Sequence, residues 1–186
     1  MPEYTSRANE LGIAISEAYK ASALFYQQGL DTNEMVELSN ETLKMARIAG
    51  LDASEATDRM TAALRGFNME LNQASAQKVA DVYSQLAAIT ASDVDEISSA
   101  MTKTASIASS AGMEFETTAA FLSQIIETTR ESAETAGTAM KTVIARFQEL
   151  KKDPNDIGEV EGEIVDANAI ETALRSVGVS LRDAGG

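Results

Sequence analysis

The chain has 186 residues with 29 acidic and 15 basic side chains, a net charge of −14, and it is 44% hydrophobic and 5% aromatic. A protein that reads DNA or RNA needs cationic side chains to displace counterions, so this charge excludes that class; it also disfavours adsorption to an anionic membrane. No apolar run approaches the roughly 20 residues of a membrane-spanning helix. We therefore expect no nucleic-acid binding and no membrane contact from this segment.

The composition is typical of an all-α protein. The two prolines are Pro2 and Pro154, so the long stretch between them lacks the residue that breaks helix interiors. Runs of β-branched and aromatic residues, which mark strands, are few. Because aromatic residues are scarce, Ala, Met and Leu must fill the core, which favours helices packed closely through small side chains.

A turn signal recurs at intervals of 20 to 22 residues, starting at residues 29, 50, 70, 90 and 112. Its copies are Gly29-Leu30-Asp31, Gly50-Leu51-Asp52, Glu70-Leu71-Asn72, Thr90-Ala91-Ser92 and Gly112-Met113-Glu114. The glycine suits the left-handed conformation after a helix, and the Asp, Asn or Ser two residues later can accept hydrogen bonds from the next helix's free amides. Asp31 with Glu34, and Asp52 with Glu55, have the spacing of a capping box.

This punctuation predicts an array or bundle of about seven to eight short antiparallel helices with tight, glycine-containing turns. Its period is shorter than the 33 to 47 residues of the common two-helix repeats. The predicted helices span residues 7–28, 33–49, 53–65, 73–88, 93–110, 115–129 and 131–150. Apolar periodicity predicts these core residues: Leu11, Ala14, Ile15, Ala18, Ser22, Phe25, Ala56, Met60, Ala63, Leu64, Phe67, Val79, Val82, Tyr83, Leu86, Ile97, Met101, Ala105, Ala108, Phe121, Leu122, Ile125, Ile126, Ala136, Met140, Val143, Ile144, Phe147 and Leu150.

The stretch 131–150 is graded along its length. Its first turns consist of Ala, Gly, Ser and Thr, and its second half carries bulky apolar residues at steps of three and four. Small side chains let another backbone approach closely, so this helix is suited to docking against neighbours. It carries no group suited to catalysis.

The composition changes after residue 152. Residues 153–166 contain six acidic and no basic side chains, with two glycines, which predicts a surface loop or hairpin. A short helix is predicted over residues 167–177. We therefore expect a helical core domain over 1–152, an acidic surface loop over 153–166, and a short helix with a truncated end over 167–186, as in a piece of a longer protein.

The residues provide little for catalysis. His and Cys are absent, which excludes histidine-based triads and thiolate metal sites. The carboxylate groups Asp93/Asp95/Glu96 and Glu114/Glu116 lie at helix starts, where the helix dipole favours acids, so a structural role is the better interpretation.

The acidic segment 153–166 partly matches a calcium-binding loop. Asp153, Asn155 and Gly158 fit positions one, three and six of an EF-hand loop, but Ile157 and Ile164 occupy positions that require ligands. We therefore predict no catalytic, cofactor-binding or metal site, and no cofactor.

Several motifs, taken in order, resemble phage tail tape measure proteins. The strongest are residues 111–122, A-G-M-E-F-E-T-T-A-A-F-L, and 134–141, E-T-A-G-T-A-M-K. Residues 50–64, 78–81 and 176–183 are also similar to that family, so the resemblance covers nearly the whole chain from about residue 11.

The resemblance implies a non-enzymatic structural part of a phage or prophage tail, involved in tail assembly and tail-length determination. It implies location in the lumen of the virion tail tube, and in the host bacterial cytoplasm during assembly. The implied partners are other copies of the chain, tail tube and tail initiator proteins, and tail assembly chaperones. The frequent turns favour the family's compact N-terminal region over its extended rod. The alternatives are a generic helical interaction module of a bacterial protein and, last, a cell-wall hydrolase.

Overall fold

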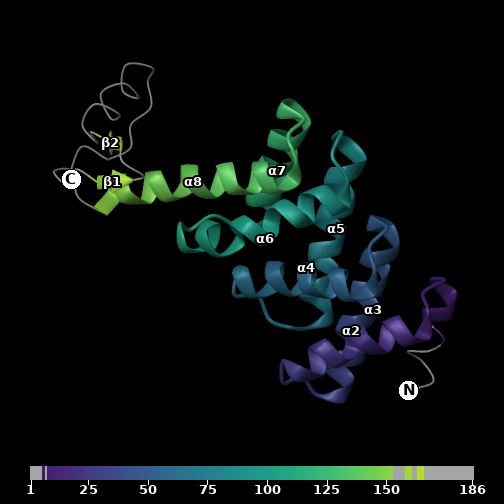
Figure 1. The fold of residues 1–186 in the computed structure, drawn as a ribbon. Coiled ribbons are helices and arrows are strands. Elements are labelled where there is room, and N and C mark those ends of the chain that lie inside the picture. Colours follow the sequence, from purple (N-terminus) through teal and green to yellow (C-terminus); the bar gives the residue numbers. More distant parts are fainter. Residues whose placement is uncertain (1–5, 7, 153–157, 161–162, 166–186) are drawn as a thin grey trace. The chain divides into compact units, whose positions relative to one another are not determined.

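The computed structural model describes residue 6 and residues 8–152, 158–160 and 163–165, with side chains up to residue 148 (Figure 1). The chain divides into two compact units, Met1–Lys141 and Thr142–Gly186. The helices are α2 (Ile15–Gln27), α3 (Thr32–Ala49), α4 (Ala53–Gly66), α5 (Gln73–Ile89), α6 (Val94–Ser110), α7 (Phe115–Thr129) and α8 (Ala133–Lys152). The predicted all-α array of short helices is confirmed.

The helices of the first unit stack in two rows. In one row α4 packs against both α2 and α6; in the other α5 packs against both α3 and α7. Successive helices also pack across the rows, as α3 does with α4 and α6 with α7. Each helix thus meets its row neighbour two elements further along the chain.

The repeating unit is therefore a pair of helices. The helix-capping residues Asp52 and Asp93 are 41 residues apart, and so are Asp31 and Asn72. The expectation that the repeat is shorter than that of two-helix repeat proteins was wrong. The spacing of 20 to 22 residues is the length of one helix and its turn, whereas the packing arrangement repeats after every second helix.

The predicted caps and glycines account for most helix ends. Asp31 and Asp93 form full capping boxes with Glu34 and Glu96, and the Asp52 side chain accepts a hydrogen bond from the Glu55 amide. Gly29, Gly50 and Gly112 all have positive φ. The prediction fails at α6, where Asp93 rather than Ser92 is the cap. At the start of α7, Glu114 makes no side-chain capping hydrogen bond.

The first predicted helix, 7–28, was also wrong. Residues 8–10 are helical, then the chain turns at Gly12 with φ of +67°, and α2 begins at Ile15. The Ile13 amide donates to the Ala8 carbonyl at 2.9 Å and closes the turn. The apolar pattern did not reveal this break, because Leu11 and Ile13 on the turn pack against the same hydrophobic cluster as Ala18 of α2.

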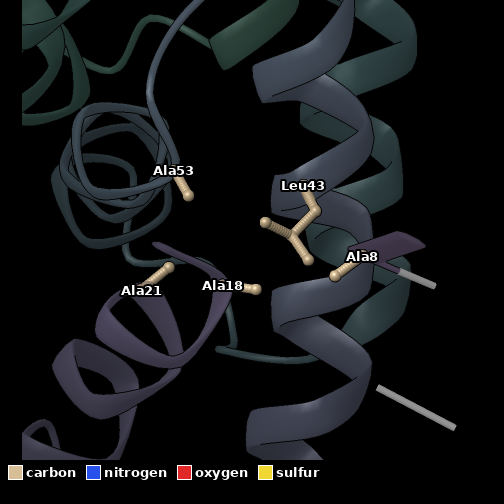
Figure 2. Close-up of a cluster of buried hydrophobic side chains, with 5 residues drawn as sticks. All are labelled: Ala8, Ala18, Ala21, Leu43 and Ala53. Atoms are coloured by element: carbon tan, nitrogen blue, oxygen red, sulfur yellow. The ribbon is translucent and has the colours of Figure 1, made fainter. Parts of the chain in front are cut away.

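Small residues fill much of the core. In the cluster of Figure 2, Leu43 of α3 lies among Ala8, Ala18, Ala21 and Ala53, which come from the N-terminal turn, α2 and the start of α4. The fully buried large side chains are Tyr83, Phe25, Leu38, Leu43, Met45, Met60, Leu64, Ile97, Met101, Leu122 and Val79. Burial of one such Leu or Met stabilises the fold by about 1.5–3 kcal/mol.

Several residues predicted to be buried are exposed instead: Ala14, Ile15, Phe121, Val143 and Phe147. Adjacent apolar residues such as Phe121 and Leu122 differ by about 100° around a helix. A helix that packs on one side buries one of the two, here Leu122, and apolar spacing alone does not select between them. Leu150 lies outside the described side chains.

In the second unit, β1 (Gly158–Val160) pairs antiparallel with β2 (Glu163–Val165), with Gly158 opposite Val165. This hairpin falls within the acidic segment 153–166, for which a loop or hairpin was predicted. The predicted helix 167–177 lies outside the described residues, and the predicted domain boundaries stay predictions.

Candidate functional site

Helix α8 approaches α6 closely at Gly137. A Cβ atom at Gly137 would lie 2.5 Å from the Ala100 carbonyl oxygen and 3.0 Å from the Ala100 Cα in α6. The Thr104 hydroxyl donates a hydrogen bond to the Gly137 carbonyl at 3.0 Å, and the Lys103 ammonium pairs with Glu134 at 3.0 Å. The small-residue half of this helix thus docks as its sequence predicts.

Arg59 joins α4 to α6 through polar contacts. Its guanidinium pairs with the carboxylates of Glu55 and Asp95, and donates to the Asp95 carbonyl at 2.5 Å and to the Ser98 hydroxyl at 3.1 Å. The Arg59 side chain is only 11% exposed, so these partners replace most of its hydration. The same two helices meet at Gly66, where an added Cβ would lie 2.4 Å from the Ala105 Cβ.

The contact between α5 and α7 combines an ion pair with an aromatic cluster. Lys78 pairs with Glu116 at 2.5 Å, and the hydrogen bond from Lys78 lowers the pKa of the Glu116 carboxyl. The Phe115 ring lies edge-on to the rings of Tyr83 and Phe67, with centroids 5.5 and 5.6 Å away. Burial raises the pKa of Tyr83, whose hydroxyl has no hydrogen-bond partner in the described part of the chain.

Four of the five acidic residues considered for catalysis cap a helix or form an ion pair. Asp93 and Glu96 cap α6, Asp95 pairs with Arg59, and Glu116 pairs with Lys78. Among the described residues, no three His, Cys, Asp or Glu side chains are grouped in a way that could hold a metal ion. Two of the residues that matched an EF-hand loop, Asp153 and Asn155, lie outside the described residues. The third, Gly158, is the first residue of β1.

Sequence reasoning missed Arg59. A signal was present, because Arg59 follows Glu55 by four residues on one helix face. The decisive partner, Asp95, comes from a helix two elements away, and only the row arrangement brings the two together.

Exposed apolar residues are a second feature of the surface. Ile15, Tyr19 and Tyr26 on α2 are 39%, 42% and 67% exposed, and Ala23 on the same helix is also exposed. These four residues follow one another at steps of four, four and three, so they form a continuous stripe, here called the α2 stripe. Prediction missed the stripe because Ile15 was assigned to the core.

This arrangement defines an all-α protein of stacked helices, in which the polar contacts described above cap helix ends or join neighbouring helices. Within the part of the chain that the structure describes, none of the helices combines the length and the hydropathy of a membrane span. The chain belongs to the family described as phage-related minor tail protein, whose model matches residues 5–186. That family makes it a structural protein of a phage tail.

A curated relative, the tape measure protein of Pneumococcus phage Dp-1, is 28% identical over 158 residues, which cover 85% of this chain. The matched region is 12% of that relative, so the chain spans about an eighth of its length. No solved structure matches the chain. The resemblance drawn from residues 111–122 and 134–141 is thereby confirmed.

Proposed function

We propose that this chain is the compact helical assembly segment of a tail tape measure protein, with no enzymatic activity, and that it takes part in tail assembly and tail-length determination. The observation that carries the proposal is the family match over residues 5–186, nearly the whole chain. The likeness to a tape measure protein over 85% of the chain supports it further.

The fold suggests how the work is divided. An α-helix advances 1.5 Å per residue, so a continuous helix converts sequence length into physical length. Among the described residues the longest helix, α8, has 20 residues, about 30 Å, and the helices before it are separated by short turns. An array of short helices that reverse direction does not convert its sequence length into physical length, but it offers a compact surface for binding partners. This segment therefore positions the tape measure protein, while extended helical sequence elsewhere in that protein sets the tail length.

The proposed partners are other copies of the chain, tail tube proteins, the tail initiator and tail assembly chaperones. The proposed locations are the lumen of the tail tube in the virion and the host bacterial cytoplasm during assembly. A surface rich in helix-terminal acids and a net charge of −14 keep the chain soluble and favour partners with basic surfaces.

In-frame deletions in the phage tail protein that carries this chain test the proposal. Deletion within extended helical sequence outside this array should shorten tails by about 1.5 Å per residue removed, as measured in electron micrographs. Deletion of this array should abolish tails instead. Tails of unchanged number and length after both deletions would contradict the proposal.

A further inference from the structure

Helix α8 begins in the same way as α4 and α6. The three helices follow the capping residues Asp52, Asp93 and Ser132, and the Ser132 hydroxyl accepts a hydrogen bond from the Thr135 amide at 3.2 Å. The residues at positions four, eight and twelve after these caps are buried in all three helices: Ala56, Met60, Leu64, Ile97, Met101, Ala105, Ala136, Met140 and Ile144. Equivalent positions of the three helices can therefore be compared directly.

Position eleven after the cap differs between these helices. Ala63 of α4 and Thr104 of α6 are fully buried, whereas Val143 of α8 is 52% exposed. Position fifteen shows the same contrast between α6 and α8, since Ala108 is fully buried and Phe147 is 41% exposed. Positions eleven and fifteen are four residues apart and lie on one side of a helix. Helix α8 therefore exposes apolar side chains at positions that the earlier helices bury.

In the earlier helices this side receives the next helix of the row. The Thr104 hydroxyl of α6 donates a hydrogen bond to the Gly137 carbonyl of α8. In α4, Arg59 and Gly66 flank position eleven on the same side, and both contact α6. Continuing this interface from α8 requires a helix on the side that carries positions eleven and fifteen. Among the described residues no helix follows α8.

The segment after the hairpin has the apolar pattern of such a helix. The helix predicted over residues 167–177 carries Ile170, Leu174 and Val177 at steps of four and three, which places them on one side. A helix shorter than about 12 residues is marginal in water by itself, so this one needs a surface on which to bury its apolar side. The second compact unit, Thr142–Gly186, contains both this segment and the exposed part of α8.

The connection between α8 and this segment allows them to pack side by side. Because Gly158 pairs with Val165, and paired Cα atoms lie about 5 Å apart, the hairpin returns the chain close to where it entered. Residues 152–158 span at most about 20 Å. The segment can therefore begin near the end of α8 and run antiparallel to it. In that register Ile170 lies beside Phe147, and Leu174 lies beside Val143.

We propose that residues 167–177 form a helix that packs antiparallel on α8 and covers Val143 and Phe147. A tethered segment has an effective concentration in the millimolar range, whereas a second copy must overcome repulsion between two chains of net charge −14. The opposite side of the segment carries Thr172 and Arg175. The packed helix thus replaces an apolar surface with a polar one, as terminal repeats do in helical repeat proteins. This contact does not depend on the proposed function.

Disulfide formation within the intact chain tests the proposal, since the chain has no native cysteine. In the Val143→Cys/Leu174→Cys variant the two thiols should be close enough to form an intramolecular disulfide. Val143→Cys/Thr172→Cys is the matched control, because residue 172 lies about 200° around the helix from residue 174. The control should form its disulfide at least about tenfold more slowly.

Two outcomes of this experiment would overturn the proposal. Equal rates of disulfide formation in the two variants would mean that Leu174 does not face Val143. Disulfide-linked dimers in place of the intramolecular bond would show that a second copy, rather than the chain's own segment, covers α8.

Hydrogen exchange provides an independent measurement. Val143→Glu places a charge in the proposed contact and should speed amide exchange of residues 170–177 by about tenfold or more. Lys141→Glu is the matched control, because residue 141 lies about 200° around α8 from residue 143, and it should leave that exchange unchanged. Both positions are exposed, so neither substitution should disturb α8 itself. Exchange that is equally unaffected by Val143→Glu would contradict the proposed packing.

Discussion

Gly137 of α8 lies so close to Ala100 of α6 that a Cβ atom at residue 137 would come within 2.5 Å of the Ala100 carbonyl oxygen. Gly66 of α4 stands in a different relation to Ala105, since its added Cβ would meet a side-chain Cβ at 2.4 Å. The distance between α8 and α6 is limited by the backbone of Ala100, whereas the distance between α4 and α6 is limited by the methyl group of Ala105. The two sites therefore respond differently to compensating substitutions.

Gly137→Ala and Gly66→Ala should each lower the free energy of unfolding by about 1–3 kcal/mol through overpacking, although alanine is intrinsically the better helix former. Adding Ala105→Gly should recover much of the loss in Gly66→Ala, while Ala100→Gly should recover none in Gly137→Ala. Urea unfolding of the four single variants, the two double variants and the wild type gives both double-mutant cycles. Equal recovery in the two pairs would show that the two crossings are limited in the same way.

The cap of α6 makes a local contribution to stability. Asp93→Ala removes the acceptor for the Glu96 amide and breaks the capping box, so it should cost about 1 kcal/mol. Asp93→Asn keeps an oxygen acceptor at the same position and should cost less. The comparison is made by thermal unfolding at neutral pH, and an equally destabilised Asn variant would mean that charge, rather than the cap geometry, stabilises this helix.

Arg59 is expected to be the most important polar residue between α4 and α6. Arg59→Met keeps apolar bulk but leaves the Asp95 and Glu55 carboxylates without their partner, and should cost about 1.5–3 kcal/mol, the contribution of hydrogen bonds to a charged group. Arg59→Lys should recover only part of this, because an ammonium cannot reproduce the planar fork of donors. Full stability of the lysine variant would show that the fork geometry is unimportant.

The Lys78–Glu116 pair predicts a pH dependence. The folded pKa of Glu116 lies below its ordinary value of 4.5 because Lys78 donates a hydrogen bond to the carboxylate. A lowered folded pKa means that the stabilisation is complete above the unfolded pKa and is lost as the pH falls through the folded pKa. Because both side chains are more than 40% exposed, the effect is small, about 0.2–1 kcal/mol.

Lys78→Met should therefore be less stable than the wild type at pH 7, and the difference should shrink as the pH falls below 4.5. Chemical unfolding of both proteins at several pH values measures this difference. A gap that stays constant down to the most acidic pH would assign the effect to lost packing of the lysine side chain rather than to the ion pair.

Local signals and long-range contacts differ in how far the sequence predicts them. The caps Asp31 and Asp52 were predictable because the group that caps a helix and the amides it satisfies are neighbours in the chain. Pairing of Arg59 with Asp95 was not, because it depends on α4 and α6 being row neighbours. Which of Phe121 and Leu122 is buried depends likewise on where α6 and α5 lie around α7.

The central claim is that a phage tail requires this chain as a packed helical array. Met101→Asp in the phage tests it most directly, because Met101 is fully buried in α6 and an unpaired buried charge should unfold the array. Thr102→Asp, at the exposed neighbouring position, is the matched control. We predict that electron micrographs of lysates show normal tails with Thr102→Asp and few or none with Met101→Asp; normal tails with both variants would contradict the account.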